Sequence, residues 1–344
     1  MAATTHNGES SADDPELSAE LDDAATDGNA NCLIVGVGAS AGGLAAFEAF
    51  FSGMPAGTET GMAFVLVQHL APDHASILSE LVGRFARMQV FEVEDGMQVK
   101  PNSIYIIPPN RDLAVREGAL RLSEPESARG RRLPIDFFFR SLAADQRERA
   151  VGVVLSGTGS DGTLGVQALK AAGGMVMAQN PESTEYDGMP RSAIATGLVD
   201  HVLPPAEMAP RLLAYAQQTC HGPRRASGPP VDTTDLDLRE IFVLLNARTG
   251  HDFSQYKPNT ISRRVQRRMA VRNLPQLQDY LRCLNETPAE VDALFRDLLI
   301  GVTSFFRDSE AFAALENQVI PQLLAAKASD SVLRAWVPDR KSVV

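Results

Sequence analysis

The chain has 344 residues, of which 44% are hydrophobic and 22% are charged, and its formal net charge is −11. This composition is typical of a soluble globular protein with roughly two domains of about 150 residues each, and the acidic balance argues against a nucleic-acid partner held by overall charge. Cys32, Cys220 and Cys283 are too few and too widely spaced for a disulfide framework or a zinc site, so we expect no metal and a reducing compartment.

Residues 1–30 contain a cluster of Asp and Glu and no Lys or Arg. Low hydrophobicity combined with charge of one sign predicts a disordered acidic tail. This segment lacks the basic and apolar regions of a signal peptide, and no apolar run along the chain is long enough to span a membrane. We therefore expect a cytoplasmic protein that is not inserted in a membrane.

Between residues 31 and 218, apolar strand-like runs alternate with helical patterns. The alternation predicts an α/β fold, with a doubly wound, mostly parallel sheet in a Rossmann-like arrangement of three layers. Shorter strands and turns are expected over residues 90–122. The strands expected in the core are Cys32–Val35, Met62–Gln68, Ala150–Leu155 and Met175–Ala178, and the helices expected beside them are Ala75–Ala86, Ile135–Glu148, Pro190–Thr196 and Pro205–Gln217.

A change of pattern follows residue 218. Residues 219–234 are rich in Gly, Pro, Ser and Arg, which predicts a linker. Residues 235–327 show only amphipathic helical periodicity and predict a small all-α domain. Its expected helices are Leu238–Thr249, Pro258–Val271, Leu274–Asn285, Ala289–Leu299 and Glu310–Leu324.

Three side chains with complementary chemistry follow three of the predicted core strands: Ser40, His69 and Asp161. The carboxyl ends of parallel strands converge at one edge of a sheet. Together these residues can supply a nucleophile, a general base and a carboxylate that orients the base. Backbone N–H groups at the start of the helix after Ser40, assisted by amides near Thr158, are the expected donors to an oxyanion.

Two other interpretations of the same residues stay open on pattern alone. Ser, His and Asp beside glycine are common turn formers without any catalytic role. The run from Gly36 to Ala41 also matches the pattern G-x-G-x-x-A of a dinucleotide-binding turn. Glu59 lies near the position at which that motif places a ribose-binding acid. That match is weak because Glu59 precedes the second strand instead of ending it.

The runs GVGASAGG (36–43), VLVQHL (65–70), YIIPPNRDL (105–113), LSGTGSDGTLG (155–165) and GMPRSAIATGLVDHVLP (188–204) resemble the chemotaxis protein-glutamate methylesterase family, in its CheB-type catalytic domain. The resemblance covers nearly all of residues 31–217. It implies that Ser40, His69 and Asp161 form a catalytic triad, with Ala41, Gly42, Thr158 and Met189 around the oxyanion and the cleft. The implied reaction is hydrolysis of glutamate γ-methyl esters, and deamidation of glutamines, on the cytoplasmic domains of chemoreceptors.

The all-α part resembles the N-terminal domain of chemoreceptor glutamate methyltransferases (CheR-type), through residues 242–269 and 298–308. That resemblance implies an S-adenosylmethionine contact from Thr303 and Arg307. Residues 328–344 are similar only to the start of a methyltransferase domain, so we expect a truncated cofactor fold and no methyltransferase activity. The esterase itself needs no cofactor, and S-adenosylmethionine would belong only to a full-length methyltransferase.

Arginines at helical spacing lie on one predicted helix of the all-α part: Arg263, Arg264, Arg267 and Arg268. The methyltransferase resemblance and their shared face imply docking to acidic chemoreceptor helices. The expected partners are therefore methyl-accepting chemoreceptors and other chemotaxis signalling proteins. The alternative to an enzyme is a non-catalytic docking module that uses this basic helix.

Overall fold

The computed structural model describes residues 33–55, 59–68, 75–125, 132–220, 235–299 and 314–325. The predicted acidic tail, most of the linker and the C-terminal residues 328–344 lie outside these ranges. The described residues up to Leu299 form one compact unit. A π-helical turn, Leu315–Val319, and helix α12 (Ile320–Ala325) belong to a second unit that begins at Ile300.

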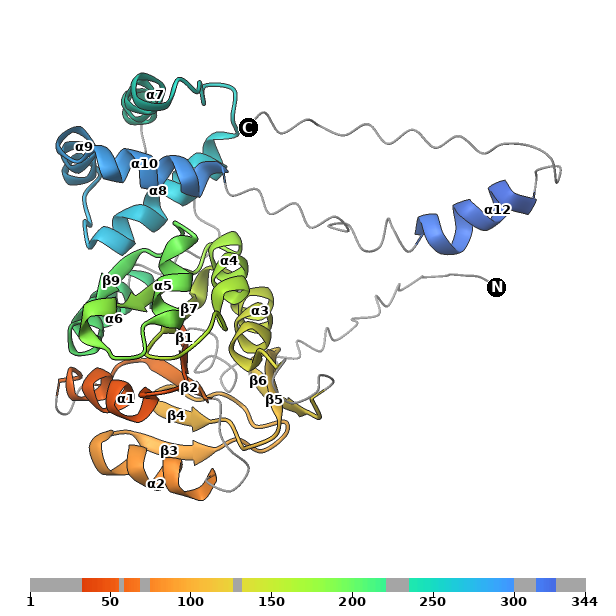
Figure 1. Cartoon of the computed structure of the whole chain (residues 1–344). Coiled ribbons are helices and arrows are strands. Elements are labelled where there is room, and N and C mark those ends of the chain that lie inside the picture. The colour runs from red at the N-terminus through yellow and green to blue at the C-terminus, as the bar shows by residue number, and fades with distance from the viewer. Residues whose placement is uncertain are drawn as a thin grey trace, which may run out of the picture. The chain divides into compact units, whose positions relative to one another are not determined.

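Seven parallel strands form the main sheet, which confirms the predicted fold class (Figure 1). Their order across the sheet is β3-β4-β2-β1-β7-β8-β9. A separate antiparallel hairpin pairs β5 (Asp112–Arg116) with β6 (Ala119–Ser123). The strands of the main sheet are β1 (Leu33–Ala39), β2 (Met62–Gln68), β3 (Gln89–Glu92), β4 (Ser103–Ile106), β7 (Ala150–Val154), β8 (Met175–Gln179) and β9 (His201–Leu203).

Helices cover both faces of this sheet and bury its central strands completely. Alternate residues of β1 belong to two different cores, because successive side chains of a strand point to opposite faces. Val35 and Val37 pack with α1 (Gly43–Ser52), α2 (Ala75–Phe85) and α6 (Pro205–Cys220). Ile34 packs in the core on the other face, which is covered by α3 (Pro134–Gln146), α4 (Thr163–Ala171) and α5 (Gly188–Ala195). Two short 3₁₀ turns, Arg147–Arg149 and Pro181–Ser183, complete this part.

The glycines of β1 allow α3 to approach the sheet closely. A Cβ at Gly38 would lie 2.5 Å from Cγ2 of Ile135, and a Cβ at Gly36 would lie 2.9 Å from the ring of Phe138. Such separations are too short for packed carbon atoms, so larger residues at either position would push α3 outward. Packing against α3 therefore explains the G-x-G spacing that also resembled a dinucleotide-binding turn.

The all-α domain has a core of its own, made where its four helices pack together. Leu245, Ile261, Tyr280 and Leu294 lie in that core, with one residue contributed by each helix. Four of the five predicted helices are confirmed within a few residues at each end. Their observed bounds are α7 (Asp235–Thr249), α8 (Pro258–Arg272), α9 (Leu277–Glu286) and α10 (Pro288–Leu299). The fifth, predicted over Glu310–Leu324, is described only from Ala314, where the π-helical turn Leu315–Val319 and α12 belong to the second unit.

Candidate functional site

The sheet changes its winding direction between β1 and β7. From β1 the chain continues to β2 on one side, and it returns later to place β7 on the other side of β1. Ligand sites of doubly wound folds form at such a switch, outside the carboxyl ends of the strands. Ser40 follows β1 directly, and the loop 156–162 follows β7. The fold thus places Ser40 and Asp161 at the same edge of the sheet.

Backbone hydrogen bonds fix the position of Ser40 at this edge. Its N–H donates to the carbonyl oxygen of Ser156 at 2.9 Å, and its own carbonyl accepts from Gly43 N–H at 3.0 Å. The side-chain amide of Gln68 donates to the same carbonyl at 3.4 Å. Ser40 is half-buried, so its hydroxyl lies on a rigid turn that is still open to a substrate.

Helix α1 begins immediately after Ser40, at Gly43. Its N-cap residue, Gly42, has φ 73°, a left-handed conformation that favours glycine. The first amides of a helix have no acceptor within the helix, and they point toward the space beyond its N-terminus. The predicted donors around Ala41 and Gly42 therefore lie where an oxyanion formed at Ser40 could accept hydrogen bonds.

The loop after β7 packs directly against the Ser40 turn. The hydroxyl of Ser156 donates to the Ala41 carbonyl oxygen at 2.7 Å. A Cβ at Gly157 would lie 3.0 Å from Cβ of Ser40 and 2.2 Å from the sulfur of Met189. Met189 is buried at the start of α5, and its N–H donates to the Gly157 carbonyl. Its contact with Gly157 is consistent with the predicted role in shaping the cleft, while Thr158 is exposed on the same loop.

Asp161 is buried, with 3% of its surface exposed, and it accepts hydrogen bonds from the start of α3. One carboxylate oxygen accepts from Ile135 N–H at 3.0 Å, and the other accepts from Asp136 N–H at 2.9 Å and from Gly162 N–H at 2.8 Å. Amides at a helix N-terminus favour a negative charge. The carboxylate is therefore held in one orientation, as a residue that positions a histidine requires.

A second buried carboxyl group lies beside Asp161. Asp136 accepts a hydrogen bond from Gly165 N–H, which joins the N-terminal turns of α3 and α4. Burial raises the pKa of Asp136, and the neighbouring charge of Asp161 raises it further. The surroundings of Asp136 therefore disfavour its charged form.

Two supporting residues were not predicted from the sequence. Gln179, at the end of β8, accepts from Ser156 N–H at 2.9 Å and donates to the carbonyl and hydroxyl of Ser183. Tyr186 lies over Gly42, whose added Cβ would be 3.0 Å from the tyrosine ring. The sequence signal that could have indicated a role for Gln179 is its position as the single polar residue at the end of an apolar strand.

Several predicted site residues lie outside the described ranges. His69 follows β2, the neighbour of β1, but the structure describes this strand only to Gln68. Thr303 and Arg307, the predicted cofactor contacts, are likewise outside them. The roles of these three residues stay predictions.

The docking prediction is wrong for Arg267 and Arg268. These side chains are only 9% and 5% exposed, and both form ion pairs with Asp200 of the sheet domain. Buried guanidinium groups with internal partners are not available to an external acidic helix. Arg263 is exposed and pairs with Glu148, and Arg264 is half-buried, so docking stays a prediction only for these two.

A polar pocket of about 400 Å³ lies near the Asp161 end of α3. Arg111 and Arg132 line it, and Arg132 donates to the side-chain oxygen of Asn110 at 2.8 Å. Arg132 precedes the α3 turn whose amides hold Asp161. The segment before Arg111 follows β4, where Ile107 N–H donates to the carbonyl of Leu66 in β2. Arg111 also pairs with Glu124 of the same pocket at 3.6 Å, so two cations and one carboxylate lie at this carboxyl edge of the sheet.

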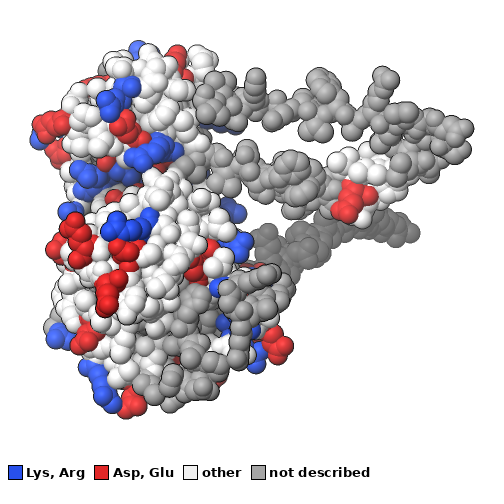
Figure 2. Space-filling view, in the orientation of Figure 1, with Lys and Arg blue, Asp and Glu red and all other residues white. Residues whose placement is uncertain are grey.

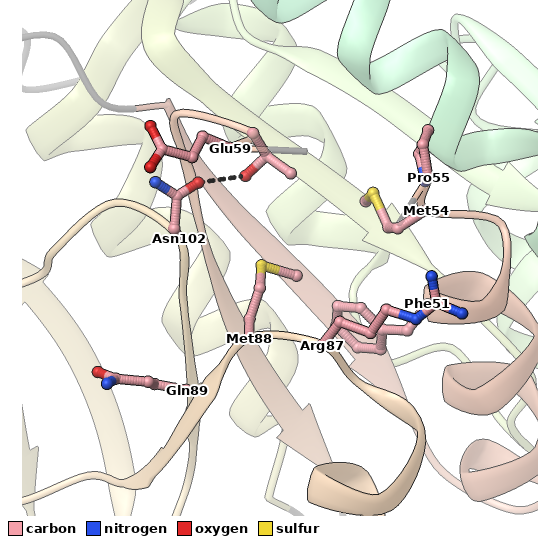
Figure 3. Close-up of a pocket in the computed structure, with 9 residues that line it drawn as sticks. Phe51, Met54, Pro55, Glu59, Arg87, Met88, Gln89 and Asn102 are labelled. Atoms are coloured by element: carbon pink, nitrogen blue, oxygen red, sulfur yellow. Dashed lines mark hydrogen bonds between the residues drawn. The ribbon is translucent and has the colours of Figure 1, made fainter. Parts of the chain in front are cut away.

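The opposite, amino edge of the sheet contains a different pocket, of about 310 Å³ (Figure 3). Phe51, Glu59, Arg87 and Asn102 are among its lining residues, and Asn102 accepts a hydrogen bond from Thr60. Because Glu59 precedes β2, it is separated from the turn after β1 by the length of the strand, about 20 Å. This position contradicts a ribose-binding role for Glu59.

Acidic and basic side chains are interspersed over the face shown in Figure 2. Within the described ranges, no helix is long and apolar enough to cross a membrane. Among the same residues, no group of three or more His, Cys, Asp or Glu side chains is arranged to hold a metal ion.

Known proteins with similar sequences point to two families. Residues 35–212, more than half of the chain, match the family described as CheB methylesterase, and residues 236–299 match the all-alpha domain of CheR methyltransferase. These matches fall within the predicted ranges 31–218 and 235–327.

An uncharacterized 104.1 kDa protein of Rhodobacter capsulatus is 41% identical over 279 residues, which cover 75% of this chain and 29% of that protein. Protein-glutamate methylesterase/protein-glutamine glutaminase 1 of Myxococcus xanthus is 36% identical, covering 54% of each chain. The chain therefore spans about half the length of the Myxococcus xanthus protein and less than a third of the Rhodobacter capsulatus protein. The solved CheB methylesterase catalytic domain of Thermotoga maritima is 30% identical with a TM-score of 0.48, covering 52% of this chain and 96% of that one. From the match over residues 35–212, the chain belongs to the CheB methylesterase family.

Proposed function

We propose that this chain is a carboxylic ester hydrolase that removes the methyl group from glutamate γ-methyl esters of chemoreceptors, in chemotaxis-type signalling. The family assignment supports the reaction class. The observation that carries the proposal for this chain is the rigid Ser40 turn, which packs against the loop that contains Asp161. Its expected substrates are the cytoplasmic domains of methyl-accepting receptors, so we propose a cytoplasmic location.

In the proposed mechanism, His69 takes the proton from the Ser40 hydroxyl as its oxygen attacks the ester carbonyl carbon. Amides at the start of α1 stabilise the oxyanion that results. The tetrahedral intermediate then expels methanol, which receives the proton from His69. A water molecule, activated by the same imidazole, hydrolyses the acyl-serine to give the glutamate carboxylate and free Ser40. Asp161 keeps the imidazole in the required tautomer.

The same groups support hydrolysis of a glutamine side chain, with ammonia as the leaving group. A relative of this chain is named both protein-glutamate methylesterase and protein-glutamine glutaminase. Arg111 and Arg132 lie at the catalytic edge, where they can attract the carboxylates that surround a glutamate substrate. The alternative of a docking module without catalysis has less support, because two of its four arginines are buried.

Mass spectrometry of a methylated chemoreceptor fragment tests this function. Incubation with the full chain is expected to convert glutamate methyl esters to glutamates, and comparison of glutamine-containing peptides reports deamidation separately. Ser40→Ala is expected to abolish both conversions. Ser192→Ala is a matched control, because Ser192 is a serine on α5 that contacts Gly159 and has no role in the proposed chemistry. Unchanged receptor peptides after treatment with the unsubstituted chain would overturn the proposal.

A further inference from the structure

Two buried arginines of α8 connect the all-α domain to the sheet domain. The side chain of Arg267 donates to the carbonyl oxygens of Gly173 at 2.7 Å and Gly174 at 2.6 Å. It also pairs with Asp200 at 2.8 Å, and with Asp297 of its own domain. One guanidinium group thus binds two backbone carbonyls and a carboxylate of the sheet domain at the same time.

Asp200 is the shared partner of the cations at this contact, and its side chain is 1% exposed. It pairs with Lys170 at 2.8 Å and with Arg268 at 3.0 Å, and it accepts from Val176 N–H at 3.0 Å. Burial alone would raise the pKa of Asp200, but the charges of Arg267, Lys170 and Arg268 outweigh burial and hold it far below its usual range. Asp200 is therefore ionised at neutral pH.

The remaining charges of the cluster are paired as well. Arg268 binds both carboxylate oxygens of Glu290, at 2.8 and 2.7 Å, and Lys170 pairs with Asp297 at 3.0 Å. The pair between Lys170 and Asp297 again joins the two domains. A buried charge without a partner is strongly unfavourable. Separating the domains would break several of these ion pairs, and each charged group would then have to be solvated by water.

Apolar and neutral contacts extend the same interface. Val271 of α8 is 3% exposed and packs in the core cluster of the sheet domain that contains Tyr215. The carbonyl of Val271 is hydrogen-bonded by the ring of His201 at 3.1 Å. Arg296 of α10 donates to the carbonyl oxygen of Gly197 at 2.6 Å. The contact therefore combines a hydrophobic anchor with a set of charges that are removed from water.

All of these contacts lie at the amino edge of the sheet. Gly173 and Gly174 precede β8, Gly197 and Asp200 precede β9, and Glu148 precedes β7. Ser40 is at the carboxyl edge, about 17 Å away along a strand of five residues. The all-α domain thus occupies one edge and leaves the catalytic edge uncovered.

We propose that the amino edge of β7, β8 and β9 is a specific docking surface, and that its occupant is the all-α domain of the same chain. Arg267 and Arg268 serve this internal contact. The two domains then remain associated as one body even when the linker between them is cut. Because the cluster is buried, moderate salt screens it only weakly. This inference is independent of the proposed catalytic activity.

The test uses the full chain with a recognition sequence for a site-specific protease inserted within residues 221–234. After cleavage of the folded protein, both halves are expected to elute together in size-exclusion chromatography at micromolar concentration. Arg267→Ala is expected to raise their dissociation constant on the order of 100-fold, because it leaves Asp200 and Asp297 short of a partner. Arg248→Ala is the matched control, since Arg248 pairs with Asp292 inside the all-α domain, and it is expected to change nothing.

An exposed pair across the interface provides a second test that does not disturb a core. Glu148→Lys places two cations together, because Glu148 pairs with Arg263, and we expect severalfold weaker association. Adding Arg263→Glu restores an opposite-charge pair and is expected to restore association. Separation of the unsubstituted halves after cleavage would overturn the proposal. Co-elution that is equally tight in Arg267→Ala, together with no effect of Glu148→Lys, would overturn the role of the charges.

Discussion

Replacing Asp161 by Asn and by Ala separates a stabilising role from a catalytic one. The carboxylate accepts at least three backbone hydrogen bonds, from Ile135, Asp136 and Gly162. Leaving a buried donor without an acceptor costs about 1–3 kcal/mol. Asp161→Ala removes both acceptor oxygens, leaves these three donors unpaired and is expected to lower the free energy of unfolding by roughly 3 kcal/mol or more.

Asp161→Asn retains one side-chain oxygen. If the asparagine oxygen faces the Asp136 and Gly162 N–H groups, two of the three hydrogen bonds are preserved. The asparagine NH2 group then faces the N–H of Ile135, and these two donors cannot bond to each other. The expected loss of stability is therefore smaller, about 1–2 kcal/mol. If Asp161 also orients His69, this variant still folds but hydrolyses receptor esters on the order of 10³–10⁴-fold more slowly.

Urea unfolding and methyl-ester hydrolysis, measured on the same preparations, distinguish these effects. We expect Asp161→Asn to lose most of its activity and to keep most of its stability. A fully active Asp161→Asn enzyme would refute the catalytic role of Asp161. An Asp161→Ala protein with unchanged stability would refute the proposed capping of α3.

Three further changes have defined outcomes. Gly157→Ala places a Cβ 2.2 Å from the Met189 sulfur and 3.0 Å from Ser40 Cβ, so we expect a stability loss of about 1–3 kcal/mol and a lower kcat on receptor esters. Arg111→Ala is expected to raise KM for a receptor fragment severalfold, and less so at high salt, with hydrolysis of a small neutral ester unchanged. Since the pKa of Asp200 is lowered on folding, Asp200→Asn should be less stable than the unsubstituted chain by a constant amount from pH 5 to 8. In the unsubstituted chain, the stabilising charge of Asp200 is lost as the pH falls below about 4. The difference in stability between the two proteins should therefore shrink at such pH values.

Controls for these predictions are available in the same chain. Gly83→Ala in α2 is matched to Gly157→Ala, because nothing lies within 4 Å of a Cβ at Gly83, and it should stabilise the protein by about 0.5–1 kcal/mol. An Arg111→Ala chain with unchanged KM would remove the arginine from substrate binding. A stability difference for Asp200→Asn that grows in acid would contradict the assigned direction of the pKa shift.

Local patterns were sufficient to predict the fold class and to place Ser40 and Asp161 after two strands that end at the same edge of the sheet. The predicted strand Cys32–Val35 and the helical pattern after Ser40 correspond to β1 and α1, but β1 continues beyond the predicted end to Ala39, so Gly36 and Gly38 lie in the strand and not in the turn. The apolar run before Ser156 corresponds to β7. Such segments are predictable because burial on both faces demands a continuous apolar strand and a sharp turn demands glycine.

Features that depend on distant partners were not predictable in this way. The spacing of Arg267 and Arg268 suggests an exposed basic face, but their partner Asp200 lies 67 and 68 positions earlier in the chain. Likewise, Gly38 makes room for Ile135, almost one hundred residues later. Helical periodicity identifies which residues share a face, but the identity of the opposing surface depends on the tertiary fold.

The most direct test of the central claim is the initial rate of methanol release from a methylated chemoreceptor fragment, measured for the full chain, Ser40→Ala and Ser192→Ala. We expect continuous release by the unsubstituted chain and by Ser192→Ala, and only background release by a folded Ser40→Ala protein. Equal rates for Ser40→Ala and the unsubstituted chain would contradict the assignment of Ser40 as the nucleophile.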